Sequence, residues 1–445
     1  MKRLFIIKDT PANKISYYHI AFFLVALPFD RFYSELILIS FLLHSLIHSN
    51  RQRFRSAFTI QNLLVSSVFF VTAIGILYSH DKAQGIKDLQ RQSAIILFPF
   101  LFSVSGLDWK KYRMNFLRIF AFTCVATILY LYIDAISIIL YNKLPLRVLF
   151  TQVFLNHNFS SPVNIHATYL GMYCLLSGVV FLYSFLNERS RSWRIIYLLS
   201  ILILLAGLVQ LASKSVLISA IAIAVFFPFF MLKGVKRVSL ITGMAIIGVF
   251  ITCIIINISS FRSRYVTQFK DDLVQTSINN EILEPRIVRW RLALQLISQS
   301  PLYGHGSGSE KRLLNDSYFN NKLYNSYLHE LNTHNQYLSI ALKTGSLGLF
   351  VFLFTLFIAF LAAFYNRDIL FGSFWAIVCI VSFSENVLDV NKGIFFYAFF
   401  FSLFIQSGKP FGRLSRSNGR RESHAYPRSV NKQENAAAVR SDNYV

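Results

Sequence analysis

The sequence predicts an all-α integral membrane protein with about 12 transmembrane helices and one large external loop before helix 10. Three observations predict this class. Of the 445 residues, 54% are apolar and only 15% are charged, a composition unlike that of a water-soluble enzyme. Apolar stretches approaching the roughly 20 residues of a membrane span recur along the chain. Lys and Arg residues gather in alternate gaps between these stretches, as they do in membrane proteins.

The apolar stretches divide the chain into four parts. Residues 1–257 hold helices 1–9, residues 258–335 form the large loop, residues 336–407 hold helices 10–12, and residues 408–445 form a polar, basic tail that we expect to be disordered. The first nine predicted spans are 16–28, 33–48, 58–79, 93–106, 116–141, 165–186, 195–211, 215–232 and 238–257. The last three are 336–364, 368–384 and 393–407.

The positive charge of the chain is an orientation signal. A formal net charge of +23 would suggest nucleic acid as a partner if the protein were soluble. Most of its Lys and Arg residues, however, lie in the N-terminal segment, in the even-numbered gaps between spans and in the C-terminal tail. Cytoplasmic loops carry this excess, so we expect both termini to be cytoplasmic and no nucleic acid to bind.

Several other functions lack support in the sequence. All four cysteines, Cys124, Cys174, Cys253 and Cys379, lie in apolar runs, so we expect buried thiols without a zinc site or disulfide. The chain has no Gly-x-x-x-x-Gly-Lys-Ser/Thr loop that would bind ATP. It also has no internal repeat of the kind that indicates the paired halves of a transporter.

The large loop contains a predicted amphipathic helix and a glycine-rich turn. The segment RIVRWRLALQLISQS begins at Arg286 and carries an apolar stripe that suggests a helix lying at the membrane surface. Arg286, Arg289 and Arg291 lie near its start, and arginine forks suit phosphate oxygens. The alternative is a basic stripe facing lipid headgroups. The following LYGHGSGSE reads as a flexible turn, without the strand-helix-strand context of a dinucleotide site.

Polar residues at predicted helix ends are the candidates for chemistry. His334 and Asn335 close the loop where it meets the tenth span, and a histidine can accept a proton from a hydroxyl near neutral pH. Lys214 lies at a tight external turn, where it either lines a wet cavity or extends its amine to the interface. His166 and Tyr169, which open the sixth span, raise the same question.

Several motifs together resemble the O-antigen ligase and O-antigen polymerase family of bacterial envelope glycosyltransferases. Arg286 is followed four residues later by Trp290, then by PLYGHGSG and finally by HNQYLSIALKTGSLGLF, which starts at His334. The stretch IHATYLGMY is similar to a His-Pro-Thr-Tyr-like stretch of many members, with Ala167 in the proline position. The resemblance covers residues 15–407 in architecture and about 165–350 in motifs.

The resemblance implies a metal-independent glycosyltransferase that needs no cofactor and sits in the bacterial inner membrane with its site in a periplasmic loop. Its donor would be a glycan on undecaprenyl diphosphate. Ligases transfer the glycan to the lipid A core, polymerases to another carrier-linked glycan, and a third type to protein hydroxyls. Ligase activity is our leading hypothesis. A transporter of lipid-linked glycans, the alternative from another class, is disfavoured because the candidate residues gather on one face.

The resemblance also implies roles for individual residues. His334 would be the general base for the acceptor hydroxyl, and Arg286 would bind the donor diphosphate with Lys214 and Arg289. A family Ser-Arg pair corresponds to Ser213-Lys214, and lysine offers a point charge in place of a fork. Four residues would support the site: Asn335, Trp290, His166 and Tyr169. Membrane lipids would surround the helices.

Overall fold

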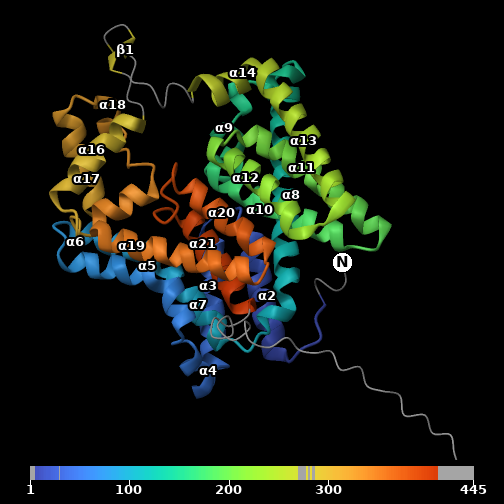
Figure 1. Cartoon of the computed structure of the whole chain (residues 1–445), viewed down its shortest axis with the longest axis horizontal. Helices are drawn as coiled ribbons and strands as arrows, with labels where there is room; N and C mark the ends of the chain where they lie inside the picture. The colour runs from blue at the N-terminus through green and yellow to red at the C-terminus, as the bar shows by residue number, and fades with distance from the viewer. Residues whose placement is uncertain (1–5, 30, 269–276, 279–280, 283–285, 409–445) are drawn as a thin grey trace, which may run out of the picture. The chain divides into compact units, whose positions relative to one another are not determined.

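Each predicted membrane span coincides with a helix in the computed structural model (Figure 1). The structure describes residues 6–29, 31–268, 277–278, 281–282 and 286–408. The described residues belong to one compact unit, residues 1–409. The predicted tail, residues 408–445, lies outside the described residues except for Gly408.

The helices that match the first nine predicted spans are α2 (Pro11–Ala26), α3 (Arg31–Ile47), α5 (Ile60–Leu77), α7 (Ser93–Val104), α8 (Trp109–Tyr141), α10 (Ala167–Asn187), α11 (Arg191–Leu211), α12 (Lys214–Met231) and α13 (Gly234–Asn257). The last three are α19 (Gln336–Tyr365), α20 (Ile369–Val381) and α21 (Asn391–Ser407). Two short helices, α4 (Arg51–Ser56) and α6 (Lys82–Arg91), lie between α3 and α7.

Among the described residues, six helices are long and apolar enough to cross a membrane: α5, α8, α10, α11, α13 and α19. Three further apolar helices, in α3, α12 and α20, are shorter. The protein is therefore a multi-pass membrane protein with a helical fold.

Capping residues set the helix starts that hydropathy misplaces. We predicted a span from residue 116, but α8 begins at Trp109 because the Asp108 side chain accepts a hydrogen bond from the Lys111 backbone N–H at 2.9 Å. Thr59 accepts in the same way from the Asn62 N–H at the start of α5. At about 1.5 Å per residue, the 33 residues of α8 exceed the roughly 30 Å of a bilayer core.

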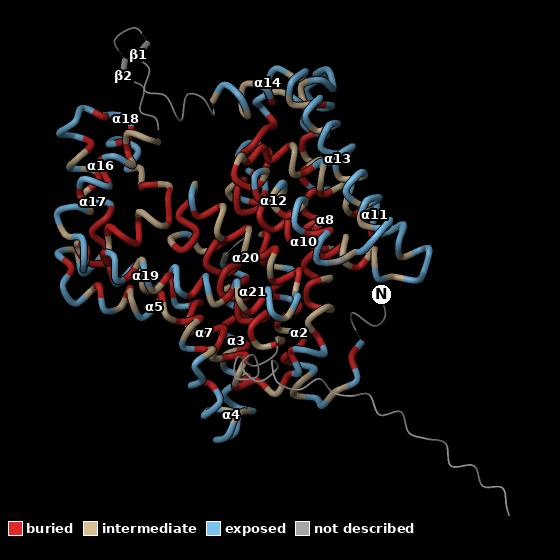
Figure 2. The backbone as a smooth tube through the Cα atoms, viewed as in Figure 1, coloured by how far each residue is buried: buried red, intermediate tan, exposed pale blue. Residues whose placement is uncertain are grey.

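Helix α21 lies in the centre of the fold, with almost every described side chain buried (Figure 2). Its Phe399 ring lies 5.5 Å from the rings of Phe23 in α2 and Phe98 in α7, and 5.6 Å from that of Phe102. Such aromatic pairs add stability beyond the area that they bury. This packing holds the start of α21 firmly, and with it the loop that joins α20 to α21.

The large loop between α13 and α19 contains several short elements. They are α14 (Ser259–Arg262), a π-helix (Ser263–Thr267), the antiparallel strands β1 (Ser277–Ile278) and β2 (Glu281–Ile282), and the helices α16 (Arg286–Gln299), α17 (Ser309–Asn320) and α18 (Tyr324–Leu328). Figure 1 shows α16 and α17 beside the start of α19.

The apolar stripe of α16 packs inside the protein. Its buried residues join Leu314 and Tyr318 of α17 and Leu342 of α19 in one cluster. The cluster contains Leu292, Ala293, Leu296, Leu314, Tyr318, Leu323 and Leu342. Leu292 and Leu296 of the stripe that suggested a membrane-surface helix are therefore covered by protein contacts, which fix α16 against α19, whereas Leu294 is 54% exposed.

The segment between α8 and α10 holds two 3-10 helices (Leu146–Phe150 and Gln152–Phe154), α9 (His157–Ser160) and a third 3-10 helix (Ser161–Val163). The cysteine prediction was wrong in part. Cys124 and Cys174 are buried, but Cys379 is partly exposed and Cys253 is exposed. Cys253 is exposed because no residue of α13 is buried within the chain.

Candidate functional site

The candidate site is built around the short loop between α20 and α21, residues 382–390, which we call the 382–390 loop. The segment that ends the large loop is bonded to it: the Gln336 N–H donates to the Ser382 carbonyl at 2.8 Å, and the Asn335 N–H donates to the Asn386 side-chain oxygen at 2.8 Å. The Leu388 N–H donates to the Gln336 side-chain oxygen at 2.7 Å. Residues about fifty positions apart in the sequence therefore form one rigid junction.

His334 lies at this junction in a strained backbone conformation. Its φ of 46° is in the left-handed region, which costs a residue other than glycine about 1–3 kcal/mol. Its neighbours hold it there. The His334 N–H donates to the Asn332 side chain at 2.9 Å, and the flanking Thr333 and Asn335 are buried. These contacts fix the backbone of His334, and its side chain is 27% exposed.

Glu385 of the 382–390 loop is the partner of His334. The His334 Nδ1 atom lies 3.5 Å from the Glu385 carboxylate, which is buried. Burial opposes ionisation of Glu385, but the contact with His334 and the positive charges of His166 and Arg286 lower its pKa below the ordinary value of 4.5. A carboxylate at Nδ1 leaves the Nε2 atom of the imidazole as the proton acceptor.

Helix α16 presents Arg286 and Trp290 to the same junction. The Arg286 Nη1 atom donates to the Ser384 carbonyl at 3.0 Å, and the Trp290 indole N–H donates to the Thr333 carbonyl at 2.9 Å. Residues four apart share one face of a helix, so the Arg-x-x-x-Trp spacing places both side chains on this junction. Arg286 is thus bonded to Ser384, and His334 lies beside the adjacent residue of the 382–390 loop, Glu385.

Lys214 is the first residue of α12, and its neighbour Ser213 connects to the site. The Ser213 hydroxyl donates to the Thr168 hydroxyl at 3.3 Å, and Thr168 donates to the Glu385 carboxylate at 3.4 Å. The turn between α11 and α12 is therefore two hydrogen bonds from Glu385. This turn places the backbone of Lys214 at the same end of the helices as Glu385, although the two residues are far apart in the sequence.

His166 and Tyr169 border the other side of the 382–390 loop. The Tyr169 hydroxyl donates to the Asn386 carbonyl at 3.3 Å. His166 caps α10, because its Nδ1 atom accepts from the Thr168 N–H at 3.4 Å. Burial lowers the pKa of His166 below 6.5, and the charges of His334, Arg286 and Arg264 lower it further, while Glu385 opposes them. His166, His334, Arg286, Arg264 and Glu385 therefore form one cluster of charged groups.

His157 and Arg264 complete this cluster. The rings of His157 and His166 lie 3.9 Å apart between centroids. Burial lowers the pKa of His157 to about 4, with His166 and Arg264 acting in the same direction. Arg264 lies in the π-helix after α14, near the start of the large loop. It adds its positive charge to the cluster that Arg286 and His334 join from later in the same loop.

Asn335 caps α19, and Arg289 lies buried in α16. The Asn335 side chain accepts from the Tyr337 and Leu338 N–H groups at 3.0 and 3.1 Å, so it caps α19. Arg289 is buried, only 6% exposed, among the residues of α16 that face the protein. Arg289 follows Arg286 by about one turn of α16, and its assignment to the diphosphate stays a prediction.

A buried charge network lies behind His334. The Lys343 amine of α19 lies 3.1 Å from Glu310 of α17 and 2.9 Å from Asp389 of the 382–390 loop. Glu310 also accepts from the Thr333 N–H at 3.2 Å and from Ser339. Burial opposes ionisation of Glu310, but Lys343 and these hydrogen bonds lower its pKa. The network ties three elements to the residue that precedes His334.

The glycine-rich PLYGHGSG segment is a clamp on α19, contrary to the expected flexible turn. The His305 and Gly306 N–H groups donate to the Leu342 and Lys343 carbonyls at 2.9 and 2.8 Å. The helix is broken at Gly345, with a φ of 66°. Gly304 and Gly306 have φ values of 68° and 90°, and their backbones approach others so closely that no side chain fits. The clamp fixes the first turns of α19 and therefore His334.

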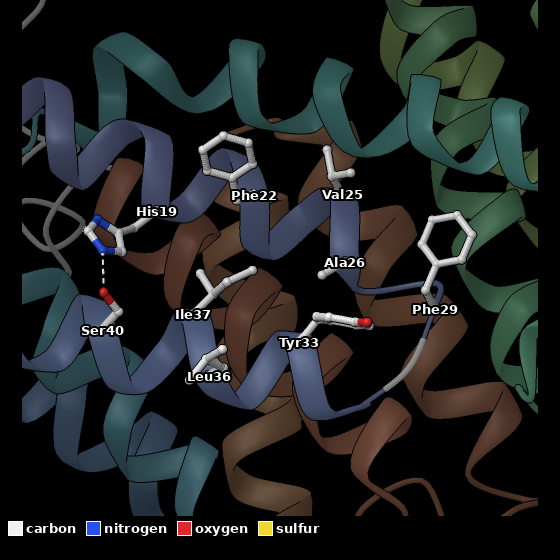
Figure 3. Close-up of a pocket in the computed structure, with 9 residues that line it drawn as sticks. All are labelled: His19, Phe22, Val25, Ala26, Phe29, Tyr33, Leu36, Ile37 and Ser40. Carbon is white, nitrogen blue, oxygen red and sulfur yellow. Dashed lines mark hydrogen bonds between the residues drawn. The ribbon is translucent and has the colours of Figure 1, made fainter.

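A large apolar groove lies elsewhere, between α2 and α3. Its volume is about 710 Å³, and Figure 3 shows His19 bonded to Ser40 at 2.9 Å at one end of an apolar lining. The groove is lined by His19, Phe22, Val25, Ala26, Phe29, Tyr33, Leu36, Ile37 and Ser40. None of the candidate site residues belongs to this lining, so size alone does not locate the site.

Sequence reasoning missed the acidic half of the site. Glu385, Asn386 and Asp389 fall in SENVLDVNK, which reads as an ordinary short connection between two spans. The available signal was its density of acid and amide groups beside an apolar helix. Lys343 was a second signal, because a lysine within a predicted span needs a buried partner. Among the described residues, no three His, Cys, Asp or Glu side chains form a group suited to a metal ion.

Comparison with protein families gives one match. Residues 199–353 match the family model described as O-antigen ligase. The matched range runs from α11 into α19 and contains Lys214, Arg286, Trp290 and His334, whereas Glu385 and His166 lie outside it. No curated protein matches the chain. Residues 199–353, a part of the chain, are therefore similar to the O-antigen ligase family.

Proposed function

We propose that the protein is an O-antigen ligase-type glycosyltransferase, which moves a glycan from undecaprenyl diphosphate to a sugar of the lipid A core. One observation carries the proposal: His334 and Arg286, both within the matched range, meet at the 382–390 loop, where His334 lies beside Glu385 and Arg286 is bonded to the adjacent Ser384. Such a transfer needs a proton acceptor and a fixed cation, and here both groups contact one short loop.

The reaction begins with the acceptor hydroxyl. Its oxygen attacks the anomeric carbon of the donor sugar, and its proton passes to the Nε2 atom of His334. The bond between that carbon and the diphosphate oxygen breaks, and the diphosphate leaves on its lipid carrier with the bonding electrons. The imidazolium that forms is stabilised by Glu385, 3.5 Å away. General base catalysis of this kind contributes about 10²–10⁴ in rate.

The cations act on the leaving group. Negative charge on the diphosphate grows as the sugar bond breaks, so fixed positive charges stabilise the transition state more than the ground state. Arg286 is held by Ser384, and Lys214 is held by the turn whose Ser213 contacts Thr168. We assign the diphosphate to the space between these two residues. Arg264, coupled to His157 and His166, is a third candidate cation for it.

The rigidity around His334 supports a catalytic role for it over a purely structural one. A left-handed histidine whose flanking residues are buried and bonded is held in an unfavourable conformation by its surroundings. Strained backbone conformations are frequent at functional sites. There the reaction benefits from a fixed side chain, although the strain lowers the stability of the fold.

The test combines genetics with purified protein. Deletion of the gene should leave long carrier-linked polymer and an uncapped lipid A core. A core capped with a single repeat unit would instead identify a polymerase, and loss of a glycan from a secreted protein would identify a protein glycosyltransferase. Purified protein should transfer glycan in detergent. Activity that requires a sealed bilayer would contradict the proposal and identify a transporter.

A further inference from the structure

We propose that a pocket of arginines at the start of α11 binds the headgroup of an anionic phospholipid. The pocket has a volume of about 360 Å³ and is lined by Phe185, Arg189, Arg191, Arg194, Ile195 and Leu198. Nothing in the proposed glycosyl transfer uses it. By the distribution of Lys and Arg along the chain, it faces the cytoplasm, whereas His334 faces the other side.

The three arginines carry positive charge that no carboxylate of the described residues neutralises through an ion pair. Arg189, Arg191 and Arg194 are exposed, and none of them forms an ion pair with a carboxylate of the residues that the structure describes. The nearby acid is Glu188, and its carboxylate accepts from the Arg189 and Ser190 N–H groups at 2.9 and 3.0 Å. These bonds turn it toward its own backbone, and they lower its pKa.

The arginine fork is partly preorganised. The Arg194 guanidinium lies 4.6 Å from the centre of the Phe185 ring, an arrangement that holds the planar group by its face and leaves its N–H groups at the edge. Arginine N–H groups in a fixed fork bind phosphate oxygens in pairs. Three such forks around one hollow suit a phosphodiester.

The apolar part of the pocket distinguishes a lipid from a free anion. Ile195 and Leu198 are 51% and 47% exposed, and both lie on the same helix as Arg191 and Arg194, about one and two turns beyond Arg191. An acyl chain attached to a bound headgroup would therefore lie along an exposed apolar surface. Basic pockets at this level of a bilayer bind anionic headgroups in the cytoplasmic leaflet.

The experiment uses the purified full-length protein in detergent, with equal amounts of phosphatidylglycerol and phosphatidylethanolamine of the same acyl chains. Native mass spectrometry should show retained phosphatidylglycerol in preference to phosphatidylethanolamine. Each arginine near an anionic headgroup contributes about fivefold, so R189Q/R191Q/R194Q should lower this retention about a hundredfold. The single variant Arg191→Glu should lower it in the same direction and guards against misfolding of the triple variant.

A matched control separates the pocket from diffuse charge. R51Q/R55Q/K110Q removes three exposed cations from the same predicted face but outside the pocket, and should keep the wild-type preference. Equal losses in both triple variants, no loss in the pocket variants, or no lipid preference in the wild type would overturn the proposal. Release of the lipid by inorganic phosphate would also overturn it, because the pocket would then be a site for the free anion.

Discussion

At the scale of single residues, the arginine and the lysine assigned to the diphosphate differ in what they can do. The Arg286 guanidinium bonds Ser384 through Nη1 and still has N–H groups for a phosphate. An ammonium group at this position has three donors on a flexible stem and cannot reproduce the fork. By the resemblance, Lys214 corresponds to an arginine of the family, so we expect Lys214→Arg to supply a fork.

We therefore expect Arg286→Lys to lower kcat/KM for glycan transfer by about tenfold or more, equivalent to about 1.4 kcal/mol of lost transition-state stabilisation. Lys214→Arg should keep or raise kcat/KM. Arg291→Lys, an exposed change on the same helix, is the control and should stay near the wild-type rate. A larger loss from Lys214→Arg than from Arg286→Lys would show that the diphosphate is misplaced.

Two histidines with lowered pKa values, His166 and His157, give a pH dependence of stability. Because the folded pKa of His166 is lowered, the unfolded chain takes up a proton at a higher pH than the folded protein does. Its contribution to folding is therefore complete above the ordinary pKa of 6.5 and declines as the pH falls below that value. His157 acts in the same sense down to about pH 4.

Replacement of His166 by Asn keeps an acceptor for the cap of α10 and removes the titration. We expect the wild-type protein to lose thermal stability between pH 7.5 and 5 more steeply than His166→Asn, when both are followed by unfolding scans in detergent. His329→Asn, at an exposed position, should follow the wild-type curve. Parallel curves for the wild type and His166→Asn would refute the assignment.

At the scale of elements, α16, α17, α19 and the 382–390 loop are locked together by buried polar contacts. Lys343 contacts Glu310 and Asp389 within 3.1 Å, and all three side chains are largely buried. Breaking a buried ion pair from one side leaves an uncompensated charge, which costs about 3–5 kcal/mol. An exposed pair contributes at most about 1 kcal/mol.

Two lysines of the chain allow this contrast to be measured. Lys343→Met should lower the unfolding free energy by about 3–5 kcal/mol and reduce transfer, because the segment that carries His334 loses its anchor. Lys311→Met removes the exposed contact with Glu330 and should change stability by less than about 1 kcal/mol. Thermal unfolding in detergent checks both values. Equal effects would mean that the network does not hold the junction.

The elements show what one sequence can and cannot predict. Hydropathy located a helix for every predicted span, since the length of an apolar stretch is a local property. It placed the start of α8 seven residues late, because capping by Asp108 does not change the hydropathy of the segment. Arg286 and His334 stood out through their motifs. Glu385 did not, because its contacts with His334 and Thr168 join residues about 50 and 217 positions apart. Such pairings depend on the packing of α10, α19 and α20, which no local pattern encodes.

At the scale of the whole chain, the account depends on orientation. His334 and the 382–390 loop lie at the ends of helices opposite to the ends that carry the arginines of α4 and α11, and from the distribution of Lys and Arg we expect those arginines to face the cytoplasm. Donor and acceptor lipids would then meet at the periplasmic face, where both are oriented by their anchors.

Single cysteines test this orientation. In a protein without its four natural cysteines, a cysteine at Lys322 in the large loop should react with a membrane-impermeant maleimide in intact spheroplasts. A cysteine at Arg191 should react only after the membrane is permeabilised. Both positions are exposed, so accessibility from one side is the difference that is measured. Labelling of Arg191→Cys in intact spheroplasts would reverse the proposed topology.

The most direct test of the proposed catalytic role is glycan transfer by purified His334→Ala protein beside the wild type. Both proteins should bind the undecaprenyl diphosphate donor in detergent, because the cations are unchanged. The wild type should join the glycan to the lipid A core, and His334→Ala should do so about 10²–10⁴ times more slowly or not at all. A variant that binds the donor and transfers near the wild-type rate would remove His334 from the reaction and contradict the mechanism.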